Sequence, residues 1–185
     1  KIKSDYQYRV APYPYGSILH AGGTSIVNNP WTMAGGSNNA TTWGWHNDGV
    51  TEYDQTTRGN NVYAMEDWNA NNGIGHSPGP TVSGEFNYVY DEANTKFEVN
   101  SGNQNAAIVN LFYWNNLIHD LTYQYGFDEV SGNFQATNGG RGGQGNDFVY
   151  ADANDGGGWD NANFSTPPDG ENPRMQMYSF INQDK

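Results

Sequence analysis

The feature that most constrains this chain is a helical repeat of apolar residues between positions 104 and 125. Its members lie four, three, four, three and four residues apart, and they are Ala107, Leu111, Trp114, Ile118, Leu121 and Tyr125. This spacing places them all on one side of an α-helix, which is typical of a helix with a buried apolar face. We therefore expect one long helix at about 104–125, with Trp114 and Ile118 buried in the core.

Residues typical of helix ends flank this repeat. Ser101, Asn103 or Asn105 can cap the first turn, and Gly126 stands where a C-terminal glycine is expected. About 21 residues at 1.5 Å each form a rod of roughly 30 Å. The sequence contains no internal repeat and no flexible linker, so we expect residues 1–185 to form a single domain around this helix.

The remainder of the chain predicts short antiparallel strands and long ordered loops. Turn residues recur throughout the first hundred positions. Alternating apolar residues predict strands at 86–90 and 96–99, joined as a hairpin by 91–95. Further strands are predicted at 148–150 and 175–180. Together with the long helix, these elements indicate an α+β fold.

Composition excludes several classes of partner. Aromatic residues make up 15% of the chain, which predicts a folded core built largely from aromatic rings. With 8 Lys and Arg against 20 Asp and Glu, the chain has no basic stripe, so we expect neither nucleic acid nor a membrane as its partner. No apolar run approaches the ~20 residues that span a bilayer. No signal peptide opens the chain, so Lys1 is expected to begin a processed or trimmed chain.

Three kinds of catalytic site are disfavoured by the motifs. The glycine-rich stretch 138–146 lacks the Gly-Lys-Ser/Thr ending and the following helix of a phosphate-binding loop, so it predicts a surface loop. No Gly-x-Ser-x-Gly motif marks a serine nucleophile. The chain has no cysteine, which excludes thiolate nucleophiles and disulfides. We therefore assign no catalytic residue.

The histidines do not predict a metal site. His20, His46, His76 and His119 include no His-Glu-x-x-His motif and no pair four residues apart on one helix face. His119 lies within the predicted helix, where a hydrogen-bonded structural role is expected. No metal ligand is assigned among them.

One acidic segment could hold calcium. Asp152, Asn154 and Asp155 place oxygen ligands before Gly156, as at the start of an EF-hand loop. The bidentate glutamate at the twelfth position of such a loop is missing. Asn- and Asp-rich turns of this kind also form without metal, so both interpretations stay open.

Taken together, the motifs resemble the fungalysin family of secreted zinc metallopeptidases, over about residues 10–180. The most specific segment reads Asn-Ala-Asn-Phe-Ser-Thr-Pro-Pro-Asp-Gly and is followed by Arg-Met-Gln-Met. The matching pieces, in family order, are 44–49, 56–61, 111–113, 119–121, 125–127, 132–135, 143–147, 161–170 and 174–177. The resemblance implies the N-terminal lobe of a thermolysin-like enzyme, a curved antiparallel sheet with one long helix packed on it.

The resemblance also implies a cofactor and partners. The complete enzyme would be secreted, would hold zinc and would hydrolyse protein or peptide substrates. In the family, a helix bearing His-Glu-x-x-His follows the Arg-x-Met-x-Met-Tyr strand, whereas this chain ends at Lys185 without it. We therefore expect no catalysis by this chain alone, and a C-terminal zinc-binding lobe as its partner.

The substrate residues implied by the resemblance are Asn161, Ala162, Asn163 and Phe164. In thermolysin-like enzymes an Asn-Ala edge strand pairs with the extended peptide, because an open strand edge offers backbone donors and acceptors. Asn161 could instead close a turn. Two other functions stay open: a non-catalytic module whose aromatic, Asn-rich surface binds carbohydrate or protein, and a non-catalytic relative acting as a chaperone or inhibitor of the partner lobe.

Overall fold

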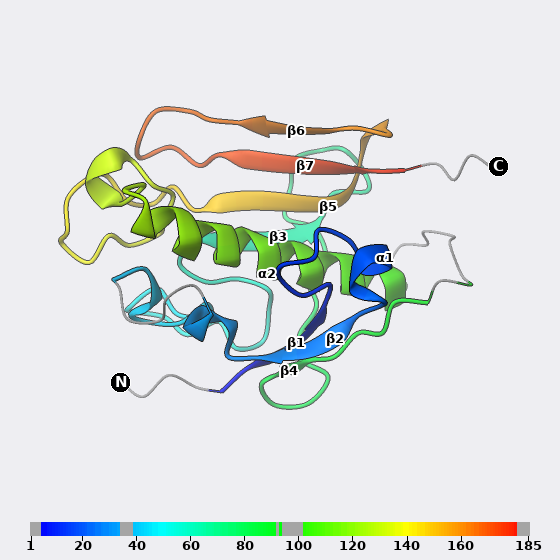
Figure 1. The fold of residues 1–185 in the computed structure, drawn as a ribbon. Helices are drawn as coiled ribbons and strands as arrows, with labels where there is room; N and C mark the ends of the chain where they lie inside the picture. The colour runs from blue at the N-terminus through cyan, green and yellow to red at the C-terminus, as the bar shows by residue number, and fades with distance from the viewer. Residues whose placement is uncertain (1–4, 34–38, 92, 94–101, 181–185) are drawn as a thin grey trace.

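The long helix lies between two β-sheets (Figure 1). The fold is that of a computed structural model, which describes residues 5–33, 39–91, 93 and 102–180. Among these residues no helix combines the length and apolar character that a membrane crossing requires. The elements in chain order are β1 (Gln7–Val10), α1 (Ile18–Ala21), β2 (Ser25–Asn28), η1 (Pro30–Thr32), η2 (Asn39–Thr41), β3 (Val62–Glu66), β4 (Glu85–Phe86), α2 (Gly102–Gln124), η3 (Glu129–Ser131), β5 (Val149–Trp159), β6 (Ala162–Ser165) and β7 (Arg174–Ser179).

Helix α2 confirms the predicted helix, and it ends as the sequence indicated. Gly126 has a φ of 98°, a conformation that residues with a side chain rarely adopt. The N–H of Phe127 donates to the carbonyl of Thr122, and the N–H of Gly126 donates to that of Tyr123, each at 3.1 Å. These two bonds form a Schellman motif, which satisfies carbonyls at the end of the helix.

The predicted buried face of the helix is wrong for Ile118, Leu121 and Tyr125, which are exposed, whereas Ala107, Leu111 and Trp114 are partly buried against the core. Ile118 is 51% exposed and Tyr125 is 86% exposed, while Leu117 is 4% exposed. Both faces carry large apolar residues, so spacing alone could not select the inner one. The buried side chains of α2 include Ile108, Val109, Phe112, Tyr113, Asn116, Leu117, His119 and Asp120.

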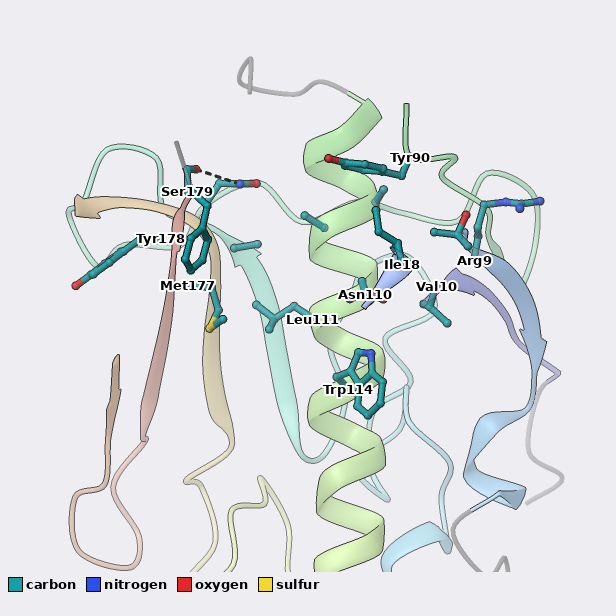
Figure 2. A pocket seen from close by; sticks show the side chains of 16 residues that line it. Arg9, Val10, Ile18, Tyr90, Asn110, Leu111, Trp114, Met177, Tyr178 and Ser179 are labelled. Carbon is teal, nitrogen blue, oxygen red and sulfur yellow. Dashed lines mark hydrogen bonds between the residues drawn. The ribbon is translucent and has the colours of Figure 1, made fainter. Parts of the chain in front are cut away.

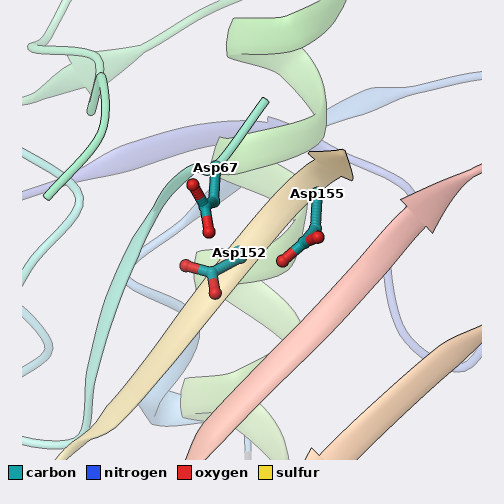
Figure 3. A group of neighbouring side chains, drawn as sticks. All are labelled: Asp67, Asp152 and Asp155. Atoms are coloured by element: carbon teal, nitrogen blue, oxygen red, sulfur yellow. The ribbon is translucent and has the colours of Figure 1, made fainter. Parts of the chain in front are cut away.

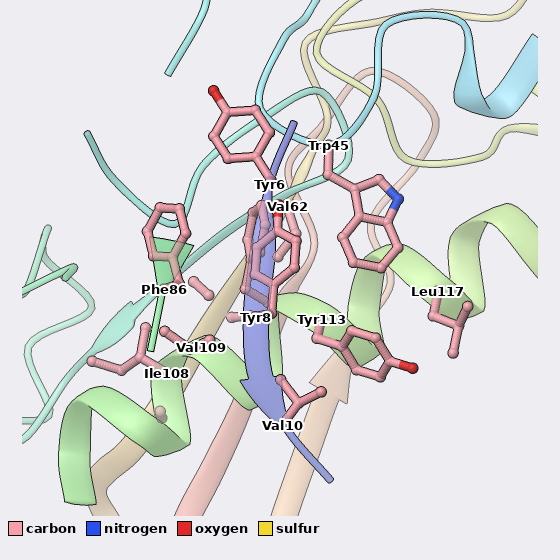
Figure 4. Close-up of a cluster of buried hydrophobic side chains, with 14 of the residues drawn as sticks. Tyr6, Tyr8, Val10, Trp45, Val62, Phe86, Ile108, Val109, Tyr113 and Leu117 are labelled. Carbon is pink, nitrogen blue, oxygen red and sulfur yellow. The ribbon is translucent and has the colours of Figure 1, made fainter. Parts of the chain in front are cut away.

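The core is built largely from aromatic rings, as the composition predicted. Tyr8, Trp45, Phe86 and Phe112 are completely buried. Figure 4 shows several of these side chains gathered between β1 and α2. The Nε1 of Trp45 donates to Oδ2 of the buried Asp120 at 2.8 Å, so the indole is both packed and hydrogen-bonded.

Both sheets are mixed, so the expectation of one antiparallel sheet is wrong. The larger sheet has the order β3-β5-β7-β6, with β3 and β7 both parallel to β5 and β6 antiparallel to β7. In the smaller sheet, β1 pairs antiparallel with β2 and parallel with β4. Helix α2 lies in the connection between β3 and β5. A long crossover of this kind allows two paired strands to run parallel.

Two of the four predicted strands are confirmed. The strand predicted at 148–150 is the start of β5, and the one predicted at 175–180 is β7. The predicted strand 86–90 is wrong beyond Phe86, where β4 ends. Its predicted partner, 96–99, lies outside the described residues.

Candidate functional site

Strand β6 lies at the edge of the larger sheet, and it contains three of the four predicted substrate residues. Among the strands that the structure describes, β6 pairs only with β7, with Ala162 opposite Met177 and Phe164 opposite Met175. All four residues of β6 are exposed. Figure 1 shows it as the outermost strand of this sheet. One side of its backbone is therefore open to an added strand.

The side chains around this edge are held in different ways. The Nδ2 of Asn163 donates to the Tyr178 hydroxyl at 2.7 Å and to Oε1 of Gln176 at 3.0 Å, which fixes it to β7. Phe164 contacts Phe134, with ring centroids 6.0 Å apart. Oδ1 of Asn161 accepts from the N–H of Ala162 at 2.9 Å, so its oxygen is used locally. Asn161 lies directly before the edge strand, whereas the resemblance implied that it belongs to the strand.

Three of the four histidines take part in ring packing or side-chain hydrogen bonds: His46, His76 and His119. His46 packs against the tilted rings of Tyr6 and Phe112, with ring centroids 4.4 and 4.8 Å away, and stacks on Phe86 at 4.9 Å. Burial lowers its pKa to about 4, although hydrogen bonds from its ring to backbone carbonyls oppose that shift. In His119, Nδ1 lies 3.1 Å from Oδ1 of Asp120 and Nε2 lies 3.1 Å from Oε1 of Gln135. These hydrogen bonds confirm its predicted structural role.

The described residues do not fit a catalytic zinc site. Such sites combine imidazole with carboxylate or thiolate ligands around one ion. The only group of three or more potential ligands that lie together in the described chain is Asp67, Asp152 and Asp155, which contains no imidazole. No step of a zinc mechanism is therefore assigned to these residues.

Parallel pairing brings these three carboxylates together. Asp67 directly follows β3, while Asp152 and Asp155 belong to β5, and Met65 lies opposite Asp152 in the register. One ligand oxygen from each carboxylate lies within 4.8 Å of the other two. Figure 3 shows the three side chains turned toward one another. The cluster therefore lies where β3 ends beside the middle of β5.

Asp152 is the most deeply buried member of the cluster. Its Oδ2 accepts from Nη1 of Arg174 at 2.5 Å, while its Oδ1 is buried without a hydrogen-bond partner in the described structure. Burial raises the pKa of Asp152 to about 6, the Arg174 ion pair opposes this shift, and the charges of Asp67 and Asp155 add to it. Sequence reasoning identified Asp152 and Asp155 as candidate oxygen ligands but missed Asp67. The only local signal for it was a pair of acidic residues after the apolar run 62–65.

An apolar groove runs along the outer side of α2. It has a volume of about 590 Å³, and Leu111 and Trp114 of the predicted stripe line it. Figure 2 shows α2 along the middle of the groove, with Met177 of β7 on one side and Ile18 on the other. The helical repeat that we predicted to be buried thus lines an open groove over part of its length.

Comparison with known sequences identifies the family. A profile of the fungalysin metallopeptidase family (M36) matches residues 7–185. The chain belongs to the fungalysin family. The resemblance drawn from the motifs is thereby confirmed.

Several fungal relatives of this fungalysin chain carry names that describe an activity. It is 42% identical over 96% of its length to extracellular metalloproteinase 2 of Phaeosphaeria nodorum. It is 41% identical over 90% of its length to extracellular metalloproteinase MEP of Leptosphaeria maculans, and 43% identical over 86% to extracellular metalloproteinase 2 of Trichophyton tonsurans. The fungalysin chain spans 27%, 25% and 24% of the length of these three relatives, respectively.

Proposed function

We propose that this chain is the N-terminal, substrate-positioning lobe of a secreted zinc endopeptidase that hydrolyses peptide bonds in proteins. Family membership and the extracellular metalloproteinases among its relatives support the reaction class. The observation that carries the positioning role is the exposed edge strand β6, which immediately follows Asn161. Family membership also disfavours the alternative of a carbohydrate-binding module.

The proposed role of β6 is to bind an extended peptide by adding it to the sheet. The exposed backbone of Ala162–Ser165 would exchange N–H···O=C bonds with the peptide backbone, whatever the peptide's side chains. The side-chain oxygen of Asn161, Oδ1, accepts from the N–H of Ala162, whereas its Nδ2 makes no hydrogen bond to the described residues. That amide would donate to a peptide carbonyl. Holding the peptide in one register places the bond to be cleaved at a fixed point.

Neighbouring contacts make this edge rigid. Asn163 is fixed to Tyr178 and Gln176 of β7. Arg174 of β7 pairs with Asp152 of β5 and donates to the carbonyl of Asn72 at 2.9 Å. Because β6 is held by β7, and β7 by β5, the peptide would meet a preorganised surface that loses little conformational entropy on binding.

The zinc of the complete enzyme is proposed to be held by another lobe. The sequence contains no His-Glu-x-x-His, and the described residues do not fit zinc, so we expect this chain alone to be inactive. The groove along α2 supports a lobe as partner. Its volume of about 590 Å³ and its apolar lining suit a packed protein segment better than water.

The test of the positioning role uses the full-length enzyme. We expect Asn161→Ala to lower kcat/KM about tenfold to a hundredfold, or about 1.4–2.7 kcal/mol, because a hydrogen bond to the peptide is lost. Asn69→Ala is the matched control, since Asn69 is exposed on the loop after β3, at the opposite edge of the sheet. Thermal unfolding of both variants should match the parent.

The kinetic outcome separates the two roles of Asn161. If kcat/KM of Asn161→Ala stays within twofold of the parent across several peptides, Asn161 only closes the turn before β6. A fall in kcat/KM that the Asn69→Ala control shares would likewise contradict a specific contact with substrate.

A further inference from the structure

We infer that Asp67, Asp152 and Asp155 form a binding site for one divalent cation of the calcium class. The inference concerns the side of the sheet where β3 ends, away from the proposed substrate edge. It does not depend on the proposed function, since it rests only on the geometry and charge of these three carboxylates.

The spacing of the carboxylates fits a single ion. Calcium takes oxygen ligands at about 2.3–2.6 Å, so two ligands on opposite sides of the ion lie at most about 5 Å apart. The three ligand oxygens of the cluster lie within 4.8 Å of one another. This spacing is compatible with one calcium-sized ion bound by all three carboxylates.

The charge of the cluster is not balanced by the protein. Asp67, Asp152 and Asp155 are 4%, 0% and 1% exposed, and Arg174 is the only cationic side chain paired with them in the described structure. Their other hydrogen-bond partners among the described residues are neutral: backbone N–H groups at Asn71, Asn72 and Gly157, and the Gln176 amide. Two buried negative charges remain when all three carboxylates are ionised, and buried charge without a counter-charge is costly.

One buried oxygen indicates where a ligand is missing. None of the residues that the structure describes hydrogen-bonds to Oδ1 of Asp152, although the side chain is completely buried. Buried polar atoms are nearly always satisfied by protein, water or an ion. The carboxyl groups of Asp67 and Asp155 are the neighbours of the Asp152 carboxylate in Figure 3. A cation held among the three would satisfy this oxygen and reduce the excess negative charge in one step.

The ligand set selects the chemical class of the ion. Three carboxylates and no imidazole favour a hard cation bound by oxygen over zinc. Calcium accepts 6–8 oxygens in flexible geometry, so water can complete the shell around three carboxylates. The Arg174 guanidinium beside Asp152 repels a cation, and we therefore expect a dissociation constant of about 0.1–1 mM, as in extracellular calcium modules. The bound ion would join the loop after β3 to β5.

The experiment measures thermal unfolding and terbium luminescence of the full 185-residue chain. In 10 mM CaCl2 the Tm should rise by about 3–10 °C relative to EGTA, and MgCl2 at the same concentration should have a smaller effect. Terbium, a luminescent substitute for calcium, should bind with stoichiometry near one, and calcium should displace it.

Variants test whether the response belongs to this cluster. Asp155→Asn should abolish most of the calcium-dependent Tm shift, and Asp67→Asn is the second variant if the first unfolds. Glu171→Gln removes one exposed negative charge that does not belong to the cluster and should keep the shift. A parent chain whose Tm and terbium emission ignore calcium overturns the inference. A shift that survives in both cluster variants overturns it too, since the binding would then be non-specific attraction to an acidic chain.

Discussion

Two neighbouring residues of α2 offer a direct test of which face of the helix is buried. Leu117 and Ile118 have isomeric side chains, and both lie in the helix interior. Leu117 is 4% exposed and belongs to the core, whereas Ile118 is 51% exposed. Substituting each by alanine removes the same number of carbon atoms, so the difference in stability between the two variants reports mainly burial.

The expected losses of stability follow from that burial. Leu117→Ala empties a buried site, which costs about 2–5 kcal/mol through lost transfer free energy and the cavity left behind. Ile118 buries about half of its side chain, and full burial of such a side chain is worth about 1.5–3 kcal/mol. Alanine also has a higher helix propensity than isoleucine by a few tenths of a kcal/mol. We therefore expect Ile118→Ala to cost about 1 kcal/mol or less.

Urea unfolding of the 185-residue chain, monitored by circular dichroism, measures both values. The m-value should not change, so a shift in midpoint can be converted directly to a free energy. Equal losses for Leu117→Ala and Ile118→Ala would contradict the packing of α2, and a larger loss for Ile118→Ala would restore the face predicted from the helical repeat.

Two further predictions concern the buried His46 and a pair of glycines, Gly59 and Gly102. Burial lowers the pKa of His46 from 6.5 to about 4. Between pH 6.5 and pH 4 the unfolded chain therefore binds a proton that the folded chain does not. The free energy of unfolding should fall by about 3 kcal/mol as the pH drops through this range. His46→Phe should remove that component, and a difference in unfolding free energy between the two proteins that is the same at pH 7 and pH 4 would refute it. A Cβ on Gly59 would lie 1.6 Å from the carbonyl oxygen of Trp45, so Gly59→Ala should cost about 3 kcal/mol or more. Gly102→Ala meets nothing within 4 Å in the first turn of α2 and should stabilise the chain by about 0.5 kcal/mol; equal Tm values for the two glycine variants would contradict this contrast.

Part of the candidate site could be predicted from sequence because its signals are local. Asn161 and the strand after it were identified from a continuous motif, and β6 does form a strand there at the edge of a sheet. Asp152 and Asp155 were recognised as candidate oxygen ligands because they are close in sequence. Asp67 lies 85 positions before Asp152, and no local pattern joins them.

The sequence by itself determined the helix, its end at Gly126 and the family, because these depend on residue spacing, on one glycine's backbone freedom and on continuous motifs. The tertiary structure decided which face of α2 is buried, since apolar residues occupy both faces and only the two sheets select one. It also decided that β3 and β5 run parallel, which brings Asp67 to Asp152. Strand pairing and helix packing join residues far apart in the chain, and the periodicity of one segment does not encode the position of its partner.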